Sequence, residues 1–93
     1  MSAPLPFKQL RGLVHIYDMR DKETVNGQRR FVYFVDNVTQ EKAKWSTGDQ
    51  DYIDVLDQLG VPLNGGEGKP GDFNVTWSGT KGAGELSIEE VSQ

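Results

Sequence analysis

The order of its apolar segments predicts that this 93-residue chain folds as an all-β barrel of five strands with one helix. Three strand-like runs come first, one amphipathic helical pattern follows, and two more strand-like runs close the chain. The 11 glycines suit the tight turns and bends of a small barrel. We therefore expect the order β-β-β-α-β-β in one domain over residues 10–93, after a flexible N-terminal lead-in over residues 1–9.

Alternation and β-propensity define the first three strands, which are expected at residues 12–17, 31–36 and 42–46. The second contains the unbroken apolar run of residues 31–35 and is the strongest strand signal in the chain. In the third, two lysines alternate with Ala43 and Trp45, so the lysines should face water and the other two should point inward. Residues 18–30 are polar and form an expected loop, with Asn26-Gly27 as a hairpin signal.

A helix is expected at residues 49–59, with Thr47 or Asp49 as its N-cap and Gly60 at its C-terminus. Its apolar stripe consists of Tyr52, Ile53, Leu56 and Leu59, and its water-facing side of Asp51, Asp54 and Asp57. The last two strands are expected at residues 72–78 and 85–91. This order of elements is that of the OB fold, a five-stranded barrel that binds its ligands on strands 2 and 3 and the neighbouring loops.

The charge of the chain is divided unevenly along its length. Residues 1–46 hold eight basic and five acidic side chains, a net charge of +3, whereas residues 47–93 hold two basic and nine acidic ones, a net charge of −7. An acidic chain can still present one basic face, and the local field matters more to a docked anion than the total. A coincidental asymmetry is the other interpretation of this pattern.

Several segments resemble the single-stranded-DNA-binding OB-fold proteins, a group that includes replication protein A and short bacterial and phage proteins. Arg11-Gly12-Leu13-Val14 opens the first strand. Residues 30–36 followed by 42–45 resemble the strand 2, D-x-x-G/T, strand 3 hairpin of that group. Residues 71–75, Gly79 and Gly84-Glu85-Leu86-Ser87-Ile88 resemble its closing G-D-x-x-x-V…G…G-x-L-x-I hairpin. The resemblance covers residues 11–91 and rests on the order of these loose motifs.

Single-stranded nucleic acid is held by stacking bases on aromatic rings and pairing phosphates with cations, and neither interaction needs base identity. The alternation of side chains gives two possible sets on one face of the second strand and does not choose between them. One set is Val32 and Phe34, and the other is Phe31, Tyr33 and Val35. The resemblance favours Phe31, because an aromatic residue five positions before the turn commonly lies on the ligand face in OB families. The expected nucleic-acid-binding residues are Phe31, Tyr33, Lys42, Lys44, Arg29, Arg30, Arg20, Lys22 and Trp45.

These residues also have simpler interpretations. The lysines can be a solvated strand face, the arginines can be solvated beside a turn, and Trp45 and Trp77 can belong to the core or its rim. Catalysis is poorly supported, because His15 is the only histidine and the helical aspartates do not have the spacing of a calcium loop. Cysteine is absent from the sequence, which excludes disulfides and thiolate metal sites. We expect no cofactor and no metal.

The sequence therefore predicts a non-catalytic protein that coats and protects single-stranded DNA in replication, recombination or repair, with RNA as the less favoured ligand. The alternative is a protein-interaction module that presents the acidic face of its helix to a basic partner. A single small domain covers few nucleotides, so homo-oligomerisation would help binding. No segment has the length of a membrane span and residues 1–7 lack the pattern of a signal peptide, so a cytoplasmic protein is expected.

Overall fold

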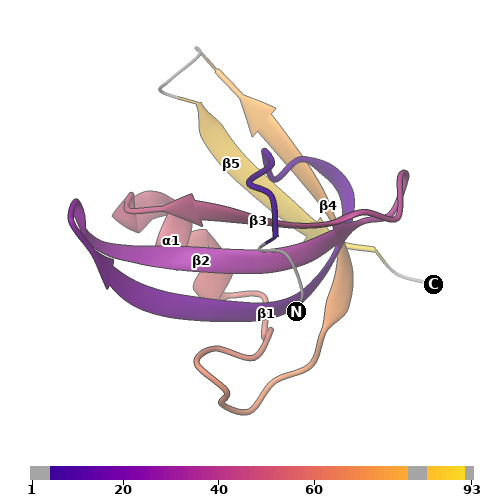
Figure 1. Cartoon of the computed structure of the whole chain (residues 1–93). Helices are drawn as coiled ribbons and strands as arrows, with labels where there is room; N and C mark the ends of the chain where they lie inside the picture. Colours follow the sequence, from indigo (N-terminus) through magenta and orange to yellow (C-terminus); the bar gives the residue numbers. More distant parts are fainter. Residues whose placement is uncertain (1–4, 80–83, 92–93) are drawn as a thin grey trace.

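The computed structural model describes residues 5–79 and 84–91 and shows a mostly β protein with one helix (Figure 1). Its elements are β1 (Gly12–Thr24), β2 (Gly27–Asp36), β3 (Lys42–Thr47), α1 (Gln50–Asp57), β4 (Gly71–Ser78) and β5 (Glu85–Glu90). The predicted order of strands and helix is confirmed.

The five strands form one antiparallel sheet in the order β3-β2-β1-β4-β5. The long strand β1 pairs with β2 along one edge and with β4 along the other. Its register against β2 shifts between Ile16 and Asp18, which makes Tyr17 a bulge residue. Bulges bend a strand and increase its twist, and the β4–β5 pair is steeply inclined to the β1–β3 part of the sheet (Figure 1).

The expected barrel is not closed, which corrects the sequence prediction. β3 and β5 are the two edges of the sheet, and the described residues show no pairing between them. Part of the expected lead-in lies against β3 instead: the Lys44 N–H donates to the Pro6 carbonyl (3.0 Å), and the Lys8 N–H donates to the Lys44 carbonyl (3.0 Å). Residues 6–8 thus occupy backbone groups at the edge of β3 that closure would need.

The core lies on one face of the sheet and is completed by α1 and the segments beside it. Its members are Leu10, Val14, Ile16, Met19, Val32, Phe34, Ala43, Leu56, Val61, Phe73, Val75 and Leu86. Val32, Phe34 and Ala43 are buried in this core, so the side chains that alternate with them on β2 and β3 lie on the other face of the sheet.

The helix has the rotation that its apolar stripe predicts. Leu56 is fully buried, whereas the three aspartates of the opposite side are exposed. Tyr52, Ile53 and Leu59 are only half-buried, so the helix covers the rim of the core as well as its centre. The Asp49 side chain accepts a hydrogen bond from the Asp51 N–H (2.9 Å), which confirms one of the two expected N-caps.

The expected polar loop at residues 18–30 is wrong, since β1 continues to Thr24 and β2 begins at Gly27. The two strands form a long hairpin with its turn at Val25 and Asn26, followed by Gly27 at a φ of 95°. The Asn26-Gly27 signal is therefore confirmed as a hairpin turn. The strand extensions lack an apolar alternation because both of their faces are largely polar, and ladder hydrogen bonds hold them instead.

Candidate nucleic-acid interface

The side chains of β2 divide between the two faces of the sheet. Val32 and Phe34 are 0% and 1% exposed, whereas Phe31 and Tyr33 lie half-buried on the face opposite the core. This is the parity that the sequence analysis favoured. In the register of the sheet, Tyr33 lies opposite Lys44 on β3, which brings a predicted ring and a predicted cation together.

Four cations lie on the same side of the sheet as these two rings. The Lys22 ammonium lies 5.3 Å from the ring centre of Phe31 and 5.9 Å from that of Tyr33. Arg29 lies opposite Lys22 in the β1–β2 register, and its guanidinium donates to the Ser46 carbonyl (3.2 Å). The other two, Lys42 and Lys44, are on β3. We call this surface the basic aromatic face and define it by Lys22, Arg29, Phe31, Tyr33, Lys42 and Lys44.

The cations of the basic aromatic face are available to an anion. The ion pairs among the described residues involve Lys8, His15, Arg20 and Arg30, and none of them involves the four cations of this face. Arg20, also predicted for the site, is exposed next to Phe31 in the register, but its guanidinium donates to Asp18 (3.0 Å). A phosphate would have to compete with that carboxylate for Arg20, whereas no carboxylate in the described part of the chain pairs with the four cations of the face.

Arg30 corrects the predicted site. Its side chain is only 5% exposed on the core side of β2, and it donates to Asp21 of β1 (2.6 Å) and to Asp57 of α1 (2.9 Å). Burial works against its charge, but the hydrogen bonds to these two carboxylates outweigh burial and raise the pKa of Arg30. This guanidinium therefore joins β1, β2 and α1 and is not placed to contact a phosphate.

Trp45 also lies away from the basic aromatic face, because it is opposite the buried Val32 in the β2–β3 register. Its ring centre is 5.8 Å from that of Trp77 and 6.5 Å from that of Tyr52. The Trp77 indole N–H donates to the Leu10 carbonyl (2.7 Å), which fixes the cluster against the segment just before β1. Both indoles are partly buried against the core, as the rim interpretation expects.

Phe7 is a ring of this surface that sequence reasoning missed. It is 65% exposed, its ring centre is 6.3 Å from that of Phe31, and the Lys44 ammonium lies 4.8 Å from its own ring centre. The neighbouring Lys8 donates to Asp36 (2.8 Å) and holds the segment in place. Only the pairing of residues 6–8 with β3 brings Phe7 to this face, and no local pattern in the lead-in signals that pairing.

The bulge residue Tyr17 adds a half-buried phenol near Asp18 and Tyr33. Burial raises the pKa of Tyr17, and the negative charge of Asp18 and the nearby Tyr33 raise it further. Its hydroxyl therefore stays neutral at physiological pH and can donate a hydrogen bond beside the two rings.

The β4–β5 half of the sheet has the opposite charge. Asp72 of β4 accepts a hydrogen bond from the Asn37 amide (3.2 Å) and lies 3.0 Å from a His15 ring nitrogen. The hydrogen bond from Asn37 and, after it, the one with His15 lower the pKa of the Asp72 carboxyl. β5 adds Glu85, Glu89 and Glu90, all exposed. An anionic strand would thus be attracted to the β1–β3 half of the sheet and repelled by the β4–β5 half.

Within residues 5–79 and 84–91, no three His, Cys, Asp or Glu side chains are grouped so that they could hold a metal ion. No helix in that part of the chain is both long enough and apolar enough to cross a membrane. Compared with known proteins, the chain matches no family model, no curated protein and no solved structure. The arrangement of its own side chains is therefore the basis for assigning a function.

Proposed function

We propose that the protein binds single-stranded DNA on the basic aromatic face and coats and protects unpaired strands in replication, recombination or repair. One observation carries the proposal: two neighbouring rings on β2 face away from the core, on the same side of the sheet as four cations that form no ion pair among the described residues. Rings bind unpaired bases by stacking, and cations bind the phosphates between them.

The geometry of the face favours a single strand over a duplex. Phe31 and Tyr33 lie two positions apart on one strand, so their rings project from the same side of the sheet. The Lys22 ammonium lies within 6 Å of both ring centres, at 5.3 and 5.9 Å, where it can pair with a phosphate beside a stacked base. Stacking of this kind requires that the bases are unpaired, which a duplex does not allow.

The fold supports the same proposal in a more general way. An OB fold is a partly open, five-stranded barrel that binds nucleic acids on the face of its strands 2 and 3. The strand order β3-β2-β1-β4-β5, with one helix between β3 and β4, is compatible with an OB fold whose barrel remains open. We propose this fold class, and the position of the basic aromatic face on β2 and β3 accords with it.

Fluorescence anisotropy of labelled oligo-dT, titrated at several salt concentrations, tests the proposal. We expect binding to oligo-dT with much weaker binding to duplex DNA. Three to four phosphate contacts on a single strand give a log–log salt slope of roughly −2 to −3. Lys42→Gln should flatten the slope by about 0.7, the value for one phosphate. Lys69→Gln is the matched control, because Lys69 lies in the segment before β4 and outside the basic aromatic face.

Equal affinity for duplex and single strand, or no binding to either at low salt, would contradict the proposal. The second result would favour the protein-interaction alternative. In that case Asp51 and Asp54 are the better contacts on α1, since Asp57 already accepts a hydrogen bond from Arg30.

A further inference from the structure

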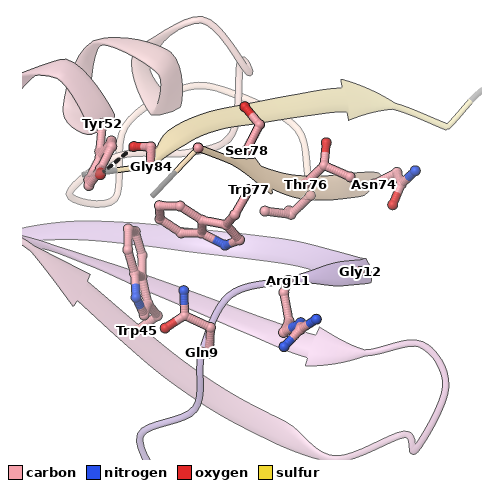
Figure 2. Close-up of a pocket in the computed structure, with 12 residues that line it drawn as sticks. Gln9, Arg11, Gly12, Trp45, Tyr52, Asn74, Thr76, Trp77, Ser78 and Gly84 are labelled. Atoms are coloured by element: carbon pink, nitrogen blue, oxygen red, sulfur yellow. Dashed lines mark hydrogen bonds between the residues drawn. The ribbon is translucent and has the colours of Figure 1, made fainter. Parts of the chain in front are cut away.

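A cleft of about 840 Å³ opens beside the aromatic cluster and is lined by residues of β3, β4, α1 and the segment before β1 (Figure 2). We call it the indole cleft. Its described lining consists of Gln9, Arg11, Gly12, Trp45, Tyr52, Asn74, Val75, Thr76, Trp77, Ser78, Gly79 and Gly84. Trp45 and Trp77 lie on the core side of the sheet, so this cleft is distinct from the basic aromatic face.

The two indoles give the cleft flat aromatic walls. Their ring planes meet at 67° with the ring centres 5.8 Å apart, and both side chains are only partly buried. The Tyr52 hydroxyl donates to the Gly84 carbonyl (2.7 Å) and closes the end of the cluster next to α1. The volume lies within the usual range of small-molecule sites, which combine aromatic walls with a few polar groups.

The charge of the cleft is opposite to that of the protein. Arg11 is exposed and takes part in no ion pair among the described residues. None of the described lining residues is acidic, although the chain has 14 acidic residues and a net charge of −4. Figure 2 shows Arg11 at one end of the cleft and Tyr52 at the other, with the indoles between them. The cleft therefore suits a ligand with a flat ring at one end and an anionic group at the other.

We infer that the indole cleft binds one nucleotide, with its base against an indole and its phosphate paired with Arg11. Arginine binds phosphate through paired N–H donors. The Gln9 amide adds a donor and an acceptor for a base edge. The side chains of Asn74, Thr76 and Ser78 lie on the other face of β4 and point away from the indoles (Figure 2). Either a free nucleotide or one unit of an unpaired strand has this chemistry, and the site is separate from the one proposed above.

Intrinsic tryptophan fluorescence reports on this cleft specifically, because Trp45 and Trp77 are the only two tryptophans in the chain and both line it. The probes are thymidine 5′-monophosphate, thymidine and inorganic phosphate. We expect saturable quenching by the nucleotide, weaker binding of thymidine by about tenfold or more, and no quenching by phosphate alone. Arg11→Gln should weaken nucleotide binding by about tenfold or more and leave thymidine binding unchanged.

Lys42→Gln is the matched control, since Lys42 lies on the basic aromatic face and should not affect quenching by the nucleotide. Far-UV circular dichroism checks that both variants fold. Quenching by oligo-dT that is equally sensitive to Arg11→Gln would identify a strand as the source of the nucleotide. Quenching by the mononucleotide alone would identify free nucleotide, and both results support the inference.

Saturable quenching by neither the mononucleotide nor oligo-dT would overturn the inference, as would quenching that Arg11→Gln leaves unchanged. The failure of each proposal is distinguishable. Anisotropy that detects oligo-dT binding without any quenching rejects the nucleotide site and leaves the proposed function standing. Quenching by the nucleotide without oligo-dT binding in the anisotropy assay rejects the proposed function and leaves the nucleotide site standing.

Discussion

Phe31 and Phe34 lie on opposite faces of β2, and replacing each by alanine should separate binding from stability. Phe34 is 1% exposed within the core, where truncation of phenylalanine to alanine costs about 3–5 kcal/mol of unfolding free energy. Phe31 is half-buried and contacts Phe7 and Lys22. An aromatic pair contributes about 0.5–1.5 kcal/mol and an exposed cation–π contact about 0.5–1 kcal/mol. Phe31→Ala should therefore cost only about 1–2.5 kcal/mol of stability.

Phe31→Ala should weaken binding of oligo-dT more than Phe34→Ala does, the reverse of their effects on stability. Loss of a stacked ring costs about 1–3 kcal/mol, so Phe31→Ala should weaken oligo-dT binding by a factor of about 5 to 150. The salt slope should stay nearly the same, because no phosphate contact is removed. The folded fraction of Phe34→Ala should bind with almost the affinity of the original protein, since its ring does not reach the basic aromatic face.

Urea denaturation measures the first quantity and anisotropy of labelled oligo-dT the second. Where Phe34→Ala does not fold, Phe34→Leu keeps most of the apolar volume and provides the same comparison. Unchanged oligo-dT affinity in a folded Phe31→Ala variant would refute the stacking role. If Phe31→Ala unfolds the protein while Phe34→Ala remains folded and fails to bind, the assignment of the two faces is inverted.

Three other changes test separate contacts. Arg30→Ala should lower the unfolding free energy by about 1.5 kcal/mol in a urea melt. This is the low end for charge-assisted hydrogen bonds, because Asp57 is partly exposed. The same variant should leave the oligo-dT affinity measured by anisotropy unchanged. Leu56→Ala should cost about 2–5 kcal/mol, and a loss well under 1 kcal/mol in a urea melt would show that α1 is not part of the core. The hydrogen bond from Lys8, and after it the one from the Val38 N–H, lowers the pKa of Asp36 in the folded protein. The Asp36 carboxylate therefore contributes its full stabilisation above pH 3.8, the ordinary pKa of an aspartate. That stabilisation is lost as the pH falls through the lowered pKa of the folded state. Acidification below 3.8 should therefore weaken the contact between Lys8 and Asp36, which NMR signals of the Lys8 side chain and the neighbouring Phe7 ring report. Unchanged signals in that range would contradict the assigned ion pair.

Local sequence patterns predict which face of an element is buried wherever burial alternates with the period of that strand or helix. The lysines of β3 alternate with Ala43, which fixed the two faces of that strand, and the stripe containing Leu56 fixed the rotation of α1. The parity of β2 was ambiguous by itself, since five apolar residues follow one another at residues 31–35. The core resolves it by burying Val32 and Phe34.

The features that the sequence did not predict depend on partners far away along the chain. Arg30 adjoins two expected site residues in the sequence. It is buried and charged because it pairs with Asp21 and with Asp57, which lie 9 and 27 positions away. Phe7 joins the basic aromatic face through a bridge to Lys44, which lies 37 positions away and has no signal in the lead-in. Barrel closure likewise depends on contacts between β3 and β5 that no local pattern encodes.

The separation of charge across the sheet explains how an acidic protein can present a site for a polyanion. The molecule extends 38 × 38 × 26 Å, whereas charges in physiological salt are largely screened beyond about 8 Å. A phosphate beside Lys22 or Lys44 would therefore respond mainly to the cations around it and little to the glutamates of β5. At low ionic strength, near 0.01 M, the screening length grows to about 30 Å and those glutamates begin to oppose binding. The acidic half of the sheet would therefore oppose binding of an anionic strand most at low ionic strength and much less at the salt concentration of the cell.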